Sequence, residues 1–407
     1  MLLEITFFML LGIAIGVLTG LLPGLHPNTV LAMILSITAL FSAYPTICIL
    51  VFIISLSISN VFLDFIPSIL LGAPDPDSCL SVLPGHQMLM QGRGYEAVMI
   101  TVAGGLCAMT ATAISLPLLL QTIPAIYNQL HQSIYILLSL AVIWMIWSET
   151  GRGKAWALLV FLASGLFGLI TLNTLSDQAL FPALTGMFGI SGLIVSFYGK
   201  SKMPPQEKRC RVGMGTVKGS AAGWVAGMAS GLLPGLGTSQ AAAVVSQAFK
   251  AKTKEFLAAM GGINTANIIF TLIAFYTLGK TRSGAASAIA QLVPAITQEE
   301  LFLLMAVGMA TTFASAFLVI RIAGPASERL QSISYRKINI SIIAFLICAI
   351  VALSGALGIL ISCAGTLLGL VAIKLGVKRS HMMGFLILPT ILYFSGNSAI
   401  VSHVLGI

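Results

Sequence analysis

Gly20-Leu21-Leu22-Pro23-Gly24-Leu25 occurs a second time in this chain, as Gly231-Leu232-Leu233-Pro234-Gly235-Leu236. Each copy lies in an apolar surrounding that would otherwise continue as a helix. Proline lacks the backbone N–H that a helix needs, and glycine adopts positive φ at little steric cost, so a helix is expected to break at each copy. The sequence therefore predicts two helices that are interrupted at matching places.

A second, weaker match follows the first in the same order. Asn60 pairs with Asn267 and Gly72 with Gly279, both 207 residues apart, whereas the first pair is 231 − 20 = 211 apart. Two matches in the same order predict a duplicated unit, at about residues 12–105 and 219–312.

The composition indicates a membrane protein. Of the 407 residues, 57% are hydrophobic and 8% are charged, whereas soluble domains carry about 25% charged residues. Runs long enough to cross a bilayer recur along the chain, so we predict an all-α, polytopic integral membrane protein with about 10–14 transmembrane or re-entrant helices. The apolar runs lie near 5–22, 29–43, 46–71, 97–120, 133–148, 155–171, 179–198, 219–236, 239–249, 256–278, 300–322, 338–354, 355–373 and 382–405. Two of them, 29–43 and 239–249, are shorter than the roughly 17 residues of a crossing and are expected to be half-helices or re-entrant hairpins.

The positive charges are distributed unevenly. The formal net charge is +9, but because the charges lie between apolar runs, retention of Lys and Arg in the cytoplasm explains them and no nucleic acid partner is expected. The first 199 residues hold three of the 21 basic residues, and residues 200–218 alone hold six. We predict an N-terminal membrane repeat (1–199), a basic cytoplasmic linker (200–218) and a C-terminal membrane repeat (219–407). Opposite charge at corresponding flanks is typical of inverted-topology repeats.

Two basic clusters complicate this topology. Lys250, Lys252 and Lys254 precede the run 256–278, and Lys280 and Arg282 follow it. A simple span would place one cluster outside, so either this run is broken or re-entrant, or the second cluster has another role.

Polar residues follow both Pro-Gly breaks. His26, Asn28 and Thr29 follow the first break, and Gly237, Thr238 and Ser239 follow the second. Asn, Thr and Ser are good N-caps, and a new helix N-terminus inside the membrane directs N–H groups and partial positive charge into a cavity, where an anion binds readily. Alternatively, the Gly and Pro residues only allow close packing or a kink. His26 also titrates near neutrality, although a lone histidine is more often structural.

Three amides and one carboxylate lie within apolar runs. Asn60 and Asp64 are four residues apart and share a helix face. An intramembrane carboxylate is a functional hypothesis by default, and Asp64 is the candidate for ion coupling, unless it lies near an interface, paired or protonated. Asn264 and Asn267 are expected either to donate to substrate oxygens or to form an interhelical hydrogen bond.

The segment around Asp75 and Asp77 contains two prolines and is expected to be a loop. A solvated exterior loop is its simplest interpretation. Lys280 and Arg282 are candidates to bind carboxylates, although cytoplasmic loop charges explain them as well.

The chain resembles a known family in several motifs. GLLPGLHPNT and GLLPGLGTSQAA resemble the paired Pro-Gly loops of the tripartite tricarboxylate transporter permease, the TctA large membrane subunit. LPGHQMLMQGRGYEA, residues 83–97, resembles that family's DGxPMxxQGRxGxA segment, and Ala266-Asn267 is similar to its EAxNNA helix. The chain departs from the pattern at Gly279-Lys280-Thr281-Arg282, which replaces an apolar loop. It also lacks a Gly-rich YGGS stretch before Asp64 and an acid before the Asn pair.

The resemblance implies ion-driven uptake of small carboxylates such as citrate, assisted by a small membrane subunit and an extracytoplasmic binding protein. We therefore expect a multi-pass secondary transporter, not an enzyme, with H⁺ or Na⁺ as the coupling ion. It is expected in the plasma membrane of a prokaryote, in contact with membrane lipid, and a homo-oligomer is one possible assembly. No metal or organic cofactor is expected, and the six cysteines form no CxxC pair. The alternatives are a lipid-phosphate carrier or flippase on the same fold, and a scaffold or intramembrane enzyme, for which no clustered acid/base set is evident. The residues predicted to bind substrate are Pro23, Gly24, His26, Asn28, Thr29, Asn60, Pro234, Gly235, Gly237, Thr238, Ser239, Asn264, Asn267, Lys280 and Arg282.

Overall fold

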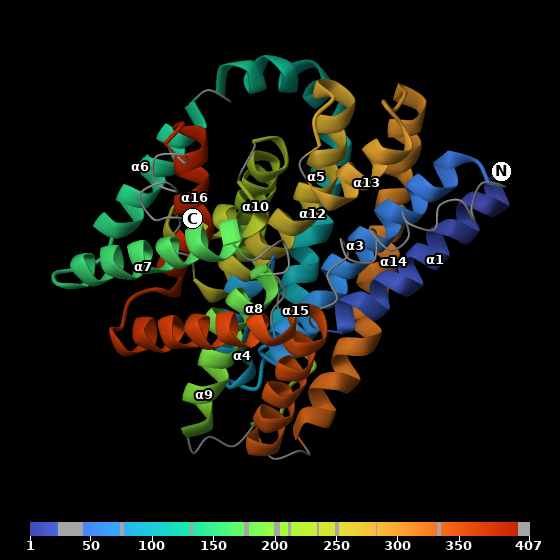
Figure 1. The fold of residues 1–407 in the computed structure, drawn as a ribbon. Helices are drawn as coiled ribbons and strands as arrows, with labels where there is room; N and C mark the ends of the chain where they lie inside the picture. The colour runs from blue at the N-terminus through green and yellow to red at the C-terminus, as the bar shows by residue number, and fades with distance from the viewer. Residues whose placement is uncertain are drawn as a thin grey trace.

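The computed structural model describes residues 1–22, 44–73, 77–130, 133–174, 179–198, 204–210, 213–233, 236–248, 252–281, 283–331 and 335–397. Within these ranges every regular element is a helix (Figure 1). Seven of the described helices are long and apolar enough to cross a membrane, which confirms the prediction of an all-α polytopic membrane protein.

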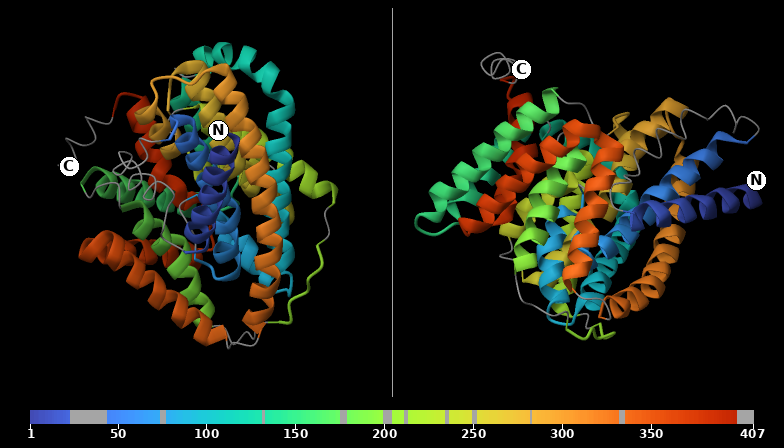
Figure 2. Two further views of the ribbon diagram at one scale, coloured as in Figure 1. Left: turned by 90° about the vertical axis from the view of Figure 1, so that its right-hand side faces the viewer. Right: turned by 60° about the horizontal axis from the view of Figure 1, so that its bottom comes forward.

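The first two helices in the described part of the chain form a tightly packed parallel pair. They are α1 (Leu2–Leu21) and α3 (Thr46–Leu70), and they lie side by side in Figure 2. Glycines spaced four residues apart on α1 face carbonyl oxygens of α3, and an added Cβ atom would lie 2.6 Å from the oxygens of Phe52, Leu56 and Asn60. Such a stripe of small residues lets two backbones approach closely where lipid provides no hydrophobic driving force.

A second pair repeats this packing. It consists of α10 (Met214–Leu232) and α12 (Thr253–Leu278). Gly223, Gly227 and Gly231 of α10 lie 211 residues after the glycines of α1. They face the carbonyl oxygens of Ala259, Ile263 and Asn267 in α12, which lie 207 residues after the corresponding residues of α3.

The ends of the paired helices also correspond. The residues that follow α1 and α10, Leu22 and Leu233, both have extended backbones. Gly72 after α3 and Gly279 at the end of α12 both have positive φ, 68° and 63°, a conformation that glycine adopts without steric penalty. The two matches found in the sequence therefore fall at equivalent structural positions.

Corresponding helices run in opposite directions relative to one end of the molecule. We call this end the basic end and define it by Arg93, Lys208 and Lys254. Helix α12 starts there, because Lys254 pairs with Glu96 of α5 (Gly94–Leu130) at 2.6 Å. Helix α3 finishes there, because Leu70 lies against Gly94.

The next pair of equivalent helices shows the same opposition. Helix α5 starts at the basic end, where the backbone N–H of Gly94 donates to Gln206 of the linker. Helix α14 (Gln298–Gln331) finishes there, because Glu328 pairs with Lys208 at 2.7 Å. Each of these helices crosses the long helix of the other unit, α5 over α12 and α14 over α3.

The long helices described above, α1, α3, α5, α10, α12 and α14, form the first group. The remaining helices form a second group. They are α6 (Ile134–Trp147), α7 (Gly153–Thr174), α8 (Leu180–Leu184), the π-helix η5 (Thr185–Ile190), α9 (Ser191–Tyr198), α15 (Tyr335–Lys374), the short 3-10 helix η6 (Arg379–Met383) and α16 (Gly384–Phe394). Helix α15 packs on α8, η5 and α9, and α16 packs on α6 and α7. In Figure 1 α6, α7 and α16 lie opposite α1, α3 and α14. The last helices of both sequence halves thus pack together.

Helix α15 is bent at Gly355, which has φ 63° and ψ −158°. This residue separates the two apolar runs, 338–354 and 355–373, that the sequence showed there.

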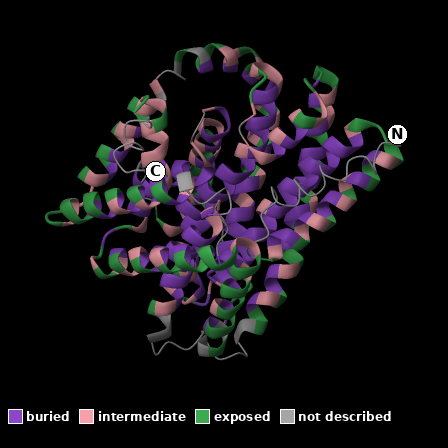
Figure 3. Ribbon diagram, viewed as in Figure 1, coloured by how far each residue is buried: buried purple, intermediate pink, exposed green. Residues whose placement is uncertain are grey.

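Two short elements lie between the groups. Helix α11 (Thr238–Ala248) contacts α10 and α12 on one side and η6 on the other, and the 3-10 helix η2 (Cys79–Ser81) contacts α11 and η5. With 11 residues, α11 is about 16 Å long, which is the length expected of a half-helix. Burial is concentrated in this central region (Figure 3).

The outer faces of the long helices are apolar. Trp147, Leu159, Phe317 and Leu360 are among the large hydrophobic side chains exposed on α6, α7, α14 and α15. In a bilayer such side chains contact lipid, so their exposure fits a membrane environment.

Helix α12 is continuous from Thr253 to Leu278. The alternative that this run is broken or re-entrant is therefore wrong. Lys280 at its end instead donates to the Tyr127 hydroxyl at 3.4 Å and lies 5.3 Å from the centre of that ring, a cation–π contact.

Candidate functional site

The N-terminus of α11 meets a carboxylate from the first half of the chain. The hydroxyl of Thr238 donates to Asp77 Oδ1 at 2.6 Å, and the Asn264 amide donates to the Asp77 carbonyl oxygen at 3.3 Å. The expectation of a solvated exterior loop is wrong for Asp77, whose neighbours Ser78 and Cys79 are fully buried. The partial positive charge of a helix N-terminus stabilises a carboxylate at this position. We call the region around these residues the polar seam.

A chain of hydroxyl groups connects the polar seam to Asp64. Ser68 donates to Asp64 Oδ1 at 3.3 Å, and the hydroxyls of Ser68 and Ser78 are 2.7 Å apart. Cys79 Sγ lies 3.7 Å from the Ser239 hydroxyl. Asp64 is 6% exposed, so its carboxyl group is buried among polar partners between α3 and the α11 N-terminus.

Asn264 has an acceptor available at the seam. Its side chain is 3% exposed, and its Oδ1 atom is buried without a hydrogen-bond partner. Leaving a buried acceptor unpaired costs about 1–3 kcal/mol, so the position favours a ligand or ion that donates to it or coordinates it.

The other two asparagines lie in helix interfaces. Asn60 donates to the Thr19 hydroxyl at 3.0 Å, and Asn267 donates to the Ser230 hydroxyl at 2.9 Å. These bonds are equivalent, because Thr19 and Ser230 are 211 residues apart. Asn267 thus forms the interhelical hydrogen bond considered as the alternative to substrate contact, and Asn60 forms the equivalent bond between α1 and α3.

The remaining predicted residues are placed as follows. Gly237 precedes α11, and its carbonyl accepts the backbone hydrogen bond from Ala241. Lys280 follows the end of α12, whose last residue Leu278 is 14 residues beyond Asn264, about 21 Å along the helix, so the structure does not bring Lys280 to the seam. Pro23, Gly24, His26, Asn28, Thr29, Pro234, Gly235 and Arg282 lie outside the described residues.

The structure adds Arg379, which the sequence analysis missed. Its guanidinium donates to the Phe188 carbonyl of η5 at 3.1 Å and lies against Gly192. Among the described residues no carboxylate lies within ion-pair distance of it. Burial lowers the pKa of Arg379 to about 10, and the side chain remains protonated at neutral pH. Its place between apolar runs was the signal that could have identified it.

A polar cluster, also missed, anchors the other end of α11. Gln247 donates to the Ser380 hydroxyl at 3.0 Å and accepts from Lys378 at 2.9 Å. The fully buried His381 lies 3.0 Å from Glu149 Oε1. Helix α11 is therefore held at its N-terminus by the first group and at its C-terminus by the second.

His86 of α4 (Val82–Leu89) predicts a pH effect on stability. Burial, and next the charge of Arg379, lower the pKa of His86 to about 4 from 6.5. As the pH falls, the His86 imidazole is protonated in the unfolded chain before it is protonated in the folded protein. The folded state therefore loses stability as the pH falls from about 6.5 towards 4. We expect the melting temperature of His86→Gln to fall less than that of the wild type between pH 7 and 4.5 in detergent. Equal slopes for the two proteins would contradict the assignment.

A polar site between two groups of membrane-spanning helices, reached by a half-helix N-terminus, is the arrangement of a multi-pass membrane transporter. Residues 6–384 match the Tripartite tricarboxylate transporter TctA family. The chain belongs to that family, a family of transporter permeases, which confirms the resemblance seen in its motifs. An uncharacterized protein of Methanocaldococcus jannaschii is 29% identical over 403 residues, which cover 95% of this chain and 98% of the relative. No solved structure matches the chain.

Proposed function

We propose that this protein is a secondary active permease for small organic anions such as di- and tricarboxylates, driven by a gradient of H⁺ or Na⁺. One observation carries the proposal: the N-terminus of α11 lies between the two helix groups and already holds a carboxylate, that of Asp77. A helix N-terminus that accommodates one carboxylate through a threonine hydroxyl suits a substrate carboxylate as well.

The two helix units support alternating access. Their glycine contacts and amide bonds correspond at offsets of 211 and 207 residues, and their equivalent helices approach the basic end from opposite directions. We infer inverted-topology repeats, of which one moves against the other around a fixed site. With the basic end in the cytoplasm, this arrangement follows the positive-inside rule.

Each residue of the polar seam has a role in the proposal. Asp77 holds Thr238 in place at the N-terminus of α11, and Ser239 and the Asn264 amide nitrogen donate to the substrate carboxylate. Asp64 carries the coupling ion, since the equivalent position 207 residues later is Thr271, which has no charge to carry one. Arg379 balances further negative charge from the η5 side of the seam.

The family name points to partner subunits. A tripartite system suggests a small membrane subunit and an extracytoplasmic binding protein that delivers substrate, in the plasma membrane of a prokaryote. The apolar outer faces leave room for lipid, a small subunit or a second copy of the chain.

Uptake of radiolabelled citrate into proteoliposomes tests the proposal. We expect saturable uptake that requires a pH or Na⁺ gradient and is lost in Asp64→Asn, because the amide cannot take up or release the coupling ion. Glu328→Gln makes the same chemical change in a half-exposed surface ion pair and should transport normally.

The proposal fails if Asp64→Asn transports citrate as the wild type does. It also fails if the wild type carries an isoprenoid phosphate but no carboxylate under the same gradients.

A further inference from the structure

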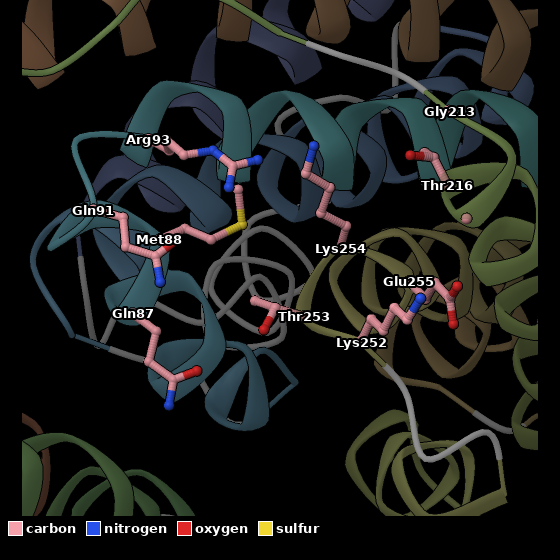
Figure 4. A pocket seen from close by; sticks show the side chains of 11 residues that line it. Gln87, Met88, Gln91, Arg93, Gly213, Thr216, Lys252, Thr253, Lys254 and Glu255 are labelled. Atoms are coloured by element: carbon pink, nitrogen blue, oxygen red, sulfur yellow. The ribbon is translucent and has the colours of Figure 1, made fainter.

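A cavity of about 420 Å³ opens at the basic end, away from the polar seam (Figure 4). It lies between α4 and the N-termini of α10 and α12. Its lining includes Gln87, Gln91, Arg93, Thr216, Lys252 and Lys254. This volume lies within the range of small-molecule sites.

The cavity is positively charged. Arg93, Lys252 and Lys254 contribute three cations against the one carboxylate that lines it, Glu255. The adjacent Glu96, whose side chain is 4% exposed, accepts from Arg93 at 2.7 Å and from Lys254 at 2.6 Å. This buried carboxylate holds the two cations at the cavity wall and leaves Lys252 without an ion pair among the described residues.

Two helix N-termini add to this charge. Gly213 and Lys252 are the N-cap residues of α10 and α12; Gly213 has no side chain, and the Lys252 side chain does not cap its helix. Residues of both first turns line the cavity, so backbone N–H groups from two helices converge there. The partial positive charge of a helix N-terminus favours phosphate and carboxylate groups.

Thr216 supplies a further polar group. Its side chain is 2% exposed and lines the cavity, and its hydroxyl oxygen has no hydrogen-bond partner. In Figure 4 it lies on the wall formed by α10, across from Gln87 and Arg93. A buried hydroxyl without a partner is destabilising unless a ligand satisfies it.

We propose that this cavity binds the phosphate or carboxylate group of an anionic ligand, at a site separate from the polar seam. Lys254 and Asn264 are ten residues apart on α12, which places the two sites about 15 Å apart along the helix. The group belongs either to a soluble anion or to an anionic lipid headgroup, since both present the same oxygens to the same donors.

Equilibrium binding to the purified full chain tests the site without any transport measurement. Inorganic phosphate and citrate are titrated in detergent. Thermal stability is compared in nanodiscs of phosphatidylcholine with and without phosphatidylglycerol. Lys252→Glu should weaken the effective ligand at least about tenfold, because it reverses a charge that lines the cavity. Lys218→Glu is the matched control, because Lys218 is exposed on the same α10 helix and does not line the cavity.

Binding of phosphate or citrate that Lys252→Glu weakens and Lys218→Glu preserves supports a soluble ligand. Stabilisation by phosphatidylglycerol alone, with the same response to the variants, supports a lipid headgroup. Thr216→Val should weaken the same ligand, whereas Thr277→Val, which removes a hydroxyl bonded within α12, should leave it unchanged. The proposal is overturned if the wild type responds to none of these ligands, or if both charge reversals weaken binding equally. The result of the citrate uptake experiment does not depend on the outcome of these binding measurements.

Discussion

Gly261→Ala should unfold at a much lower temperature than the wild type, although alanine is the better helix former. A Cβ atom at Gly261 of α12 would overlap the Thr101 carbonyl group of α5, and one at Gly104 of α5 would overlap the Ala258 carbonyl group. Because both obstacles are backbone atoms, the helices must separate at the crossing of α5 and α12. We expect a loss of about 3 kcal/mol, measured as a lower melting temperature and a smaller monodisperse fraction in detergent.

Gly324→Ala is the matched control for this substitution. It makes the same change inside α14, where the added Cβ atom would lie 3.4 Å from the flexible end of Lys208. We expect no loss, and a gain of up to about 1 kcal/mol from helix propensity. If both variants melted alike, the close crossing of α5 and α12 would not be what stabilises this fold.

The second large effect is expected on transport, at the contact between Asp77 and Thr238. Thr238 is 4% exposed and donates to Asp77 at 2.6 Å. A hydrogen bond to a charged group contributes about 1.5–3 kcal/mol, so Asp77→Asn and Thr238→Val should each lower the kcat/KM of citrate uptake by roughly 10–150-fold. In a double-mutant cycle the two losses should be less than additive, since both remove one interaction.

Thr277→Val provides the control for the threonine. Its hydroxyl bonds to the Ile273 carbonyl within its own helix, away from the seam, and uptake should be unchanged. Full additivity of Asp77→Asn and Thr238→Val would mean that this contact is not part of the transport site.

Local chemistry was enough to predict much of this fold. A proline followed directly by a glycine disfavours continuation of a helix, and the observed ends of α1 at Leu21 and α10 at Leu232 agree with the position of the repeated Pro-Gly motif. Hydropathy and length predicted the spanning helices and the short α11, and the offsets of 211 and 207 residues identified equivalent positions. Helix ends and spanning lengths depend on residues that are close together in the chain, which is why they can be predicted from a single sequence.

The partners of the polar residues were beyond such reasoning. The prolines beside Asp77 predict a loop backbone but not the residues that pack on it. Thr238 is 161 residues away in the sequence, so only the tertiary structure brings the two residues together.

Arg379 and His381 were overlooked for the same reason, since η6 meets α11 and η5 through contacts between distant segments. The helices of the two groups are similarly apolar, and hydropathy does not distinguish their neighbours. The positions of glycines such as Gly104 and Gly261, where one backbone fits against another, select which helices touch.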